Sequence, residues 1–178
     1  MFVLISVNPP YTDMIFNGYK PFEFRKKVLR GMDTGYPTEE ITAYIYETKN
    51  KGGVGAVVGE VKIDGAYTPD YARDPESTSK LVRERYMLVK SMYLMWCEMK
   101  GIKPNMNEGW FKSKEFMAYQ REIGFIGKDD SLNFNYALLL NEPQKYTHPK
   151  PLSCFKNLDG AVLSRPPQNM QRVKEMNI

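Results

Sequence analysis

Charged side chains are concentrated in the stretch Asn17 to Lys27, NGYKPFEFRKK, and their spacing points to a site that recognises a ligand. From Phe22 onward, aromatic and charged residues alternate, which is typical of a half-buried strand. Glu23 and Arg25 would then share one face, with Lys20 just before the strand. Such a face suits an anionic or hydrogen-bonding ligand. The alternative is an edge strand whose charges are merely solvated.

Further basic and aromatic residues favour a nucleic-acid partner, RNA more than DNA. Lys26, Lys27 and Arg30 extend the charged stretch. Phosphates are contacted by Lys and Arg, whereas unstacked bases are contacted by aromatic faces. Tyr44 and Tyr46 lie on the polar side of a predicted strand and are candidates for base stacking. Packing on the strand surface is the alternative for both tyrosines.

Few residues are available for metal or cofactor chemistry. The chain has two cysteines, Cys97 and Cys154, without a Cys-x-x-Cys pair, and one histidine, His148. This set is too small to close an ordinary zinc site. His148 lies between Thr147 and Pro149 with no nucleophile motif nearby, and Cys97 falls on an apolar helix. We therefore expect no metal and no cofactor.

The composition indicates one globular domain spanning residues 1–178. The 178 residues are 42% hydrophobic and 13% aromatic, which is enough to form a core. The net charge of +4 permits a nucleic-acid partner without requiring one. No signal peptide, transmembrane helix or membrane partner is expected. The low cysteine content favours a cytoplasmic location.

The first half of the chain predicts a bent sheet. Its expected elements are a strand over Phe2–Val7, a short helix over Pro10–Asn17, and strands within 20–28, 40–48 and 54–63. Gly55 and Gly59 interrupt the last of these strands and suggest a bulge or a close approach of another segment. Strong bending is what a small barrel requires.

The second half predicts helices packed beside that sheet. A helix should begin near Ser77 or Thr78 and run to about Lys100, and a second, capped by Ser113, should span residues 114–123. A strand is expected over 132–140, an extended segment over 146–151, a helical turn over 152–155 and an extended segment over 169–173. In the first helix, an apolar stripe is expected to face the core, although an adaptable partner surface is the alternative; its residues are Leu81, Leu88, Met92, Met95 and Met99.

At this point the chain resembles the ASCH family of the PUA-like superfamily. The family signature Gly-x-Lys-x-x-Glu-x-Arg is complete from Gly18 to Arg25. The lead-in ISVNPPYTDMIFNG and the segments YIYET and VVGEV are similar to family strands and to its short helix. The tail from Tyr146 to Val173 looks like that of a longer subgroup found in bacteria and their phages. The segment from about 64 to 106 matches least and is interpreted as a divergent helical insertion.

The resemblance implies an α+β fold, a PUA-like bent β-barrel with helices packed alongside, and a role in RNA binding. A few small ASCH members resemble amidohydrolases that act on acylated cytidine through a Lys, a Thr and a Glu. The family Lys falls on Lys20, the Thr position is occupied by Glu23, and the Glu could fall on Glu108. Because Glu23 has no hydroxyl nucleophile, this chemistry does not carry over unchanged.

Three functions are therefore weighed. The first is an RNA-binding module that uses Lys20, Glu23, Arg25, Lys26 and the two tyrosines. The second is a small hydrolase acting on a modified nucleoside or on RNA, with Lys20, Glu23 and Glu108 as catalytic groups. The third is a protein-interaction factor of a phage or mobile element that uses the methionine-rich helix. The first is preferred.

Overall fold

A curled sheet of six strands is the centre of the computed structural model, which describes residues 1–32, 39–67, 80–107, 109–128 and 134–176. The strands are β1 (Phe2–Val7), β2 (Phe22–Arg25), β3 (Ile41–Glu47), β4 (Ala56–Tyr67), β5 (Tyr136–Lys150) and β6 (Met170–Arg172). The α-helices are α1 (Tyr11–Phe16), α3 (Lys80–Lys100) and α4 (Lys114–Glu122). Three single 3₁₀ turns accompany them at Asn50–Gly52, Trp110–Lys112 and Leu152–Cys154.

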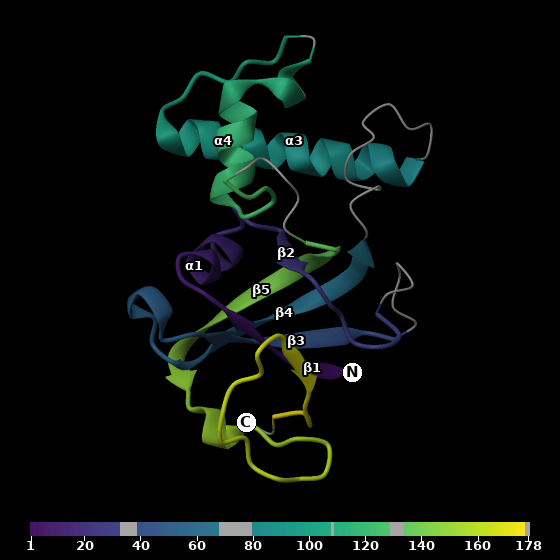
Figure 1. Ribbon diagram of the computed structural model, residues 1–178, viewed down its shortest axis with the longest axis vertical. Coiled ribbons are helices and arrows are strands. Elements are labelled where there is room, and N and C mark those ends of the chain that lie inside the picture. The colour runs from purple at the N-terminus through teal and green to yellow at the C-terminus, as the bar shows by residue number, and fades with distance from the viewer. Residues whose placement is uncertain (33–38, 68–79, 108, 129–133, 177–178) are drawn as a thin grey trace.

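The strands are ordered β2-β5-β4-β3-β1-β6. Strands β1 and β3 are parallel, and every other neighbouring pair is antiparallel. Register shifts interrupt the β3–β4 pair once and the β4–β5 pair three times. Such irregularities bend strands and increase their twist. The sheet accordingly curls into a half-barrel with helices beside it, so the predicted α+β fold with a bent barrel is confirmed (Figure 1).

Gly59 allows helix α1 to approach the sheet closely. A Cβ atom at this position would lie 2.3 Å from the carbonyl oxygen of Gln144 and 2.6 Å from the ring of Phe16. Any side chain would therefore collide both with the neighbouring strand and with the helix. The prediction that Gly59 marks a close approach is confirmed.

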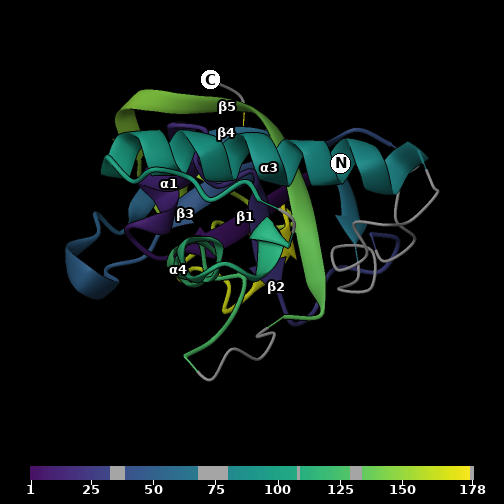
Figure 2. The same ribbon diagram turned by 90° about the horizontal axis from the view of Figure 1, so that it is seen from above.

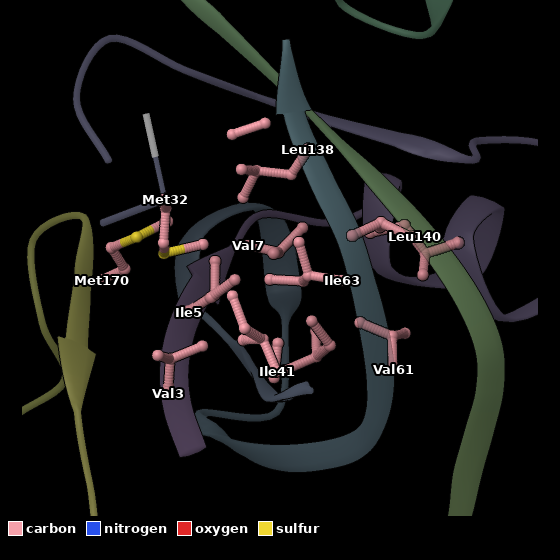
Figure 3. Close-up of a cluster of buried hydrophobic side chains, with 14 of the residues drawn as sticks. Val3, Ile5, Val7, Met32, Ile41, Val61, Ile63, Leu138, Leu140 and Met170 are labelled. Carbon is pink, nitrogen blue, oxygen red and sulfur yellow. The ribbon is translucent and has the colours of Figure 1, made fainter. Parts of the chain in front are cut away.

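The concave side of the sheet encloses the main hydrophobic core. Branched aliphatic side chains from β1, β3, β4 and β5 fill it, together with two methionines, Met32 and Met170 (Figure 3). Met32 follows β2 in the chain and Met170 begins β6, yet the two side chains lie side by side. The two edges of the sheet are thereby drawn together around one core.

A second core joins the helices to each other and to the sheet. It is built mainly from aromatic rings and includes Tyr93, Trp96, Trp110, Phe116 and Tyr119. Helices α3 and α4 lie together at one end of the sheet, and α1 lies between them and the strands (Figures 1 and 2). The cap predicted for α4 is confirmed, because the Phe116 amide donates to Ser113 Oγ at 3.1 Å.

The buried face of α3 differs from the predicted methionine stripe. Met92 is buried, but Met95 and Met99 are 44% and 45% exposed, so their assignment to the core is wrong. The side chains of residues 80–89, including Leu81 and Leu88, lie outside the described residues. The large rings of Tyr93 and Trp96 are buried with Met92, so the buried face of the helix is mainly aromatic. Cys97 is buried beside them as expected, and this burial raises the pKa of its thiol.

Two strands are longer than predicted. β5 begins at Tyr136 and runs without a break to Lys150, joining a predicted strand to a predicted extended segment. β4 continues to Tyr67, four residues beyond the predicted end of the strand at residue 63. Pairing between β4 and β5 extends close to both ends of the two strands, as the pairs Tyr67 with Ala137 and Val57 with Lys150 show. Backbone hydrogen bonds to a long neighbour therefore outweigh local composition here.

Candidate nucleic-acid interface

The three charged residues of the Gly18–Arg25 signature form one buried ionic cluster. Glu23 accepts from both cations: Lys20 Nζ lies 3.3 Å from Glu23 Oε2, and Arg25 Nη2 lies 3.0 Å from Glu23 Oε1. The side chains of all three are at least nine-tenths buried. β2 is an edge strand, but its charged face is turned inward. The alternative of solvated edge charges is therefore wrong.

Lys20 lies between helix α1 and strand β2. Its ammonium donates to the carbonyl of Phe22 at 2.6 Å and lies 4.2 Å from the centre of the Phe24 ring and 5.3 Å from that of Tyr11. Aromatic faces and a carbonyl replace part of the lost hydration. The side chain is 2% exposed, and this burial lowers the pKa of Lys20, although Glu23 opposes the shift.

Arg25 connects the two edges of the curled sheet. Its Nη2 donates to the carbonyl of Ser6 on β1 at 2.6 Å, and its Nη1 donates to Asn169 Oδ1 at 3.3 Å. Asn169 immediately precedes β6, the strand at the opposite edge from β2. Arg25 Nε is buried and has no hydrogen-bond partner in the described part of the chain. The arginine thus has an architectural role that sequence reasoning missed, since no local signal links it to residues 19 and 144 positions away.

The residues directly after β2 form an exposed basic segment, which we define as residues 26–30. Lys26, Lys27 and Arg30 are all exposed. No ion pair joins any of their side chains to the residues that the structure describes. Three cations thus lie close together in sequence, and no carboxylate in the described part of the chain neutralises them.

The backbone of the basic segment is held in place by three side-chain hydrogen bonds from two other parts of the chain. Asn135 Nδ2 donates to the Lys26 carbonyl at 2.9 Å, and Asn169 Nδ2 donates to the Lys27 carbonyl at 2.6 Å. Arg172 Nη2 donates to the Arg30 carbonyl at 3.2 Å. The carbonyls are therefore occupied within the protein while the cationic side chains remain exposed. A fixed, uncompensated positive segment is suited to binding an anion.

Tyr44 and Tyr46 do not present free faces. Both are buried in a third cluster, where segment 151–176 covers the convex side of the sheet with Phe155, Leu163 and Val173. The Tyr44 ring lies edge-on against Phe155 at 5.1 Å, and its hydroxyl accepts from the Met176 amide at 3.0 Å. The expectation that these rings stack on a base is therefore wrong, because later residues already cover them.

Outside the signature, Glu108 is the residue that the sequence predicts for acid–base chemistry. Glu108 falls outside the described residues, so the structure does not place it relative to Lys20. Glu60 accepts a 2.5 Å hydrogen bond from the Tyr146 hydroxyl, and burial beside this carboxylate raises the pKa of Tyr146. Among the described carboxylates, Glu23 is the one that pairs with Lys20.

Neither a metal site nor a membrane span is found in the described residues. No group of three or more His, Cys, Asp or Glu side chains there could hold a metal ion. None of the described helices combines the length and the apolar character needed to cross a bilayer.

Comparison with known proteins gives structural similarity without sequence similarity. A scan against protein-family models and a search of curated proteins both find no match. Among solved structures, ASCH from Zymomonas mobilis is similar with 17% identity and a TM-score of 0.47, over 98% of this chain and 88% of that one. Two point mutants of ZmASCH give 16% identity, TM-scores of 0.46 and 0.47, and 91% and 89% coverage of their chains, again over 98% of this chain. Because these identities and TM-scores are low, the description of the fold given above rests on the strand order and packing of this chain alone.

Proposed function

We propose that this protein binds nucleic acid, RNA foremost, and that it contacts the sugar–phosphate backbone through the basic segment 26–30. The observation that carries the proposal is the combination of exposed cations, which pair with no carboxylate among the described residues, with a backbone anchored by three side-chain hydrogen bonds. Preorganised cations lose less conformational entropy when a phosphate binds. The resemblance of residues Gly18 to Arg25 to the ASCH signature is the reason for naming RNA before DNA.

In this proposal, the buried signature residues support the contact surface instead of touching the ligand. Lys20 and Arg25 are engaged with Glu23 and with backbone carbonyls. Because Arg25 and Asn169 close the sheet directly beside Lys27, they fix the segment that carries the exposed cations.

A second consequence concerns specificity. With Tyr44 and Tyr46 covered, the tyrosines expected to stack on bases do not contribute. Backbone phosphates carry no sequence information by themselves. Binding should therefore depend strongly on salt and weakly on base sequence.

The proposal is tested by titrating a fluorescently labelled single-stranded RNA with the protein at several salt concentrations. For single strands, log K falls with log salt by about 0.7 for each neutralised phosphate. The double variant Lys26→Gln/Lys27→Gln should bind more weakly, and its salt slope should be shallower by about 1.4 if each lysine contacts one phosphate.

Lys103→Gln is the matched control, because Lys103 is also an exposed lysine but lies in the connection after α3. It should leave affinity and slope unchanged. A wild-type protein that binds no RNA, or a double variant that binds like wild type, would contradict the proposal. Equal affinity for a DNA strand of the same length and sequence would broaden the ligand from RNA to nucleic acid in general.

A hydrolase is the second candidate, favoured by one observation. Lys20 has a lowered pKa and contacts a carboxylate, an arrangement often found where protons are transferred. Under this proposal, wild type converts N4-acylcytidine or shortens RNA during the titration, and Glu23→Gln does not. Intact nucleoside and full-length RNA after prolonged incubation with wild type would remove this candidate.

A further inference from the structure

We infer that the phosphate-binding surface continues across the closed edge of the sheet onto residues 169–174, where Arg172 and Lys174 provide a second set of contacts. This inference rests on the proposed function, since it extends the same surface. It assigns a binding role to residues that follow the signature by almost 150 positions.

The first argument is that the two segments lie against each other. Asn169 and Arg172 donate to the carbonyls of Lys27 and Arg30 at 2.6 and 3.2 Å. Below these bonds, the side chains of Met32 and Met170 pack side by side in the main core (Figure 3). Hydrogen bonds and apolar packing therefore join the same two pieces of chain.

The second argument is the direction of the side chains. In extended chain, residues two positions apart share a side. Met170 contacts the core that contains Met32, and Arg172, two positions further on, reaches the Arg30 carbonyl, so the Arg172 side chain lies on the side where the basic segment runs. Lys174 follows β6, and its ammonium lies beside Gly160, so it carries the positive charge onward from Arg172. Val173 faces the opposite way and is buried in the cluster with Tyr44. Its amide bonds to the Phe2 carbonyl at 3.1 Å, which keeps the chain along β1 beyond the end of β6.

The third argument is charge. Arg172 and Lys174 are exposed, and neither forms an ion pair with any residue that the structure describes. Together with the basic segment they give five cations from two distant parts of the sequence. A polyanionic strand fits such a surface better than a single small anion does, because it offers one phosphate after another to cations on both segments.

Lys174→Gln is the sharpest test, because no hydrogen bond joins the Lys174 side chain to the residues that the structure describes. In the RNA titration, its salt slope should be shallower than that of wild type by about 0.7, with weaker binding at low salt. Arg172→Lys should keep the salt slope of wild type, since it keeps the charge. The salt slope of Arg172→Gln should be shallower by a similar amount to that of Lys174→Gln. Urea midpoints of each variant establish that the fold is intact, and Lys103→Gln again serves as the control.

The outcomes separate this inference from the proposed function. One outcome is that the salt slope becomes shallower in Lys26→Gln/Lys27→Gln but equals that of wild type in Lys174→Gln and in Arg172→Gln. In that case the inference is wrong and the proposed function stands. If wild type binds no RNA, or if none of these variants changes the slope, both are wrong. Loss of slope in both sets of variants supports a surface built from both segments.

Discussion

Glu23 is the residue on which two buried cations depend. Its two carboxylate oxygens are divided between Lys20 and Arg25, so the cluster retains one unit of positive charge inside the protein. Buried ion pairs compensate desolvation only while every partner is present. Carbonyls of Phe22 and Ser6 provide the remaining stabilisation.

Glu23→Gln should therefore destabilise the protein strongly. Two buried positive charges would face each other without a carboxylate, and breaking a buried pair in this way typically costs about 3–5 kcal/mol. Urea unfolding monitored by circular dichroism measures the change. Glu40→Gln is the control: the Glu40 side chain is 76% exposed where it pairs with Lys62, so the midpoint of this variant should stay close to that of wild type. Similar midpoints for the two variants would show that the cluster contributes nothing to stability.

The lowered pKa of Lys20 predicts how stability changes with pH. The unfolded chain keeps the usual lysine pKa near 10.5, whereas burial lowers the pKa in the folded protein. At a pH between the folded and the unfolded pKa of Lys20, the lysine is protonated in the unfolded chain but neutral in the folded protein. The free energy of unfolding therefore rises with pH in this range, because the folded protein no longer buries a charge. Below the folded pKa the penalty for burying the charge is fully present.

Lys20→Met should remove this dependence. Between pH 7 and pH 9.5, the free energy of unfolding of wild type should rise relative to that of Lys20→Met. Urea titrations of both proteins at the two pH values measure this change. Cys97 and the buried tyrosines have raised pKa values and act in the opposite sense, but they are present in both proteins and cancel. A pH-independent difference would mean that Lys20 titrates as it does in water.

At the scale of elements, Asn169 joins β2 to β6. Its side-chain oxygen accepts from Arg25 and its side-chain nitrogen donates to the Lys27 carbonyl, so one amide connects both edges of the sheet. Asn169→Ala should cost about 1–3 kcal/mol, because a part-buried guanidinium and a carbonyl lose their partner.

The same variant should also loosen both segments. Amide hydrogen exchange should become faster in 26–30 and in 170–172 together, while exchange in α4 stays unchanged. Gln171→Ala, a neighbouring substitution outside this connection, is the control. Faster exchange in only one of the two segments would show that Asn169 does not connect them.

Local patterns predicted the elements well but not their long-range contacts. The β-branched run Phe2–Val7 and the Ser113 cap are correct, because strand propensity and capping act over a few residues. Tyr44 and Tyr46 alternate with apolar residues and were expected on a free face. Both are buried because segment 151–176 covers that face. No periodicity within β3 could reveal this covering.

The candidate site was only partly predictable for the same reason. The signature placed Lys20, Glu23 and Arg25 together, and the structure brings them into contact. It did not indicate that they are buried, since a strand next to charged turns usually lies at the surface. Asn169 and Arg172 complete the site from the opposite sheet edge, and only the folded topology brings them near.

The whole molecule has two layers that share helix α1. Ile15 belongs to the core of the sheet, whereas its neighbour Met14 belongs to the aromatic core of α3 and α4. Both tryptophans of the chain, Trp96 and Trp110, lie in that second core. Tryptophan fluorescence therefore reports on the helical layer, and far-ultraviolet circular dichroism reports on the whole.

Wild type should unfold in urea with coincident transitions by both probes, as expected for a two-state domain. Met14→Ala should destabilise the protein by about 2–5 kcal/mol and weaken the junction between the layers. Its fluorescence transition should then precede that seen by circular dichroism. Coincident transitions in this variant would show that the layers are joined mainly by other contacts, such as Phe24.

The neighbours of β1 have a consequence for synthesis on the ribosome. β1 begins at Phe2, but its partners are β3 and β6, and β6 begins only at Met170. One edge of β1 thus stays open until β6, the last of the described strands, has been translated, and an open edge can pair with another chain. The exposure lasts as long as elongation does. Slow decoding of the codons between β3 and β6 would therefore favour aggregation of the nascent protein.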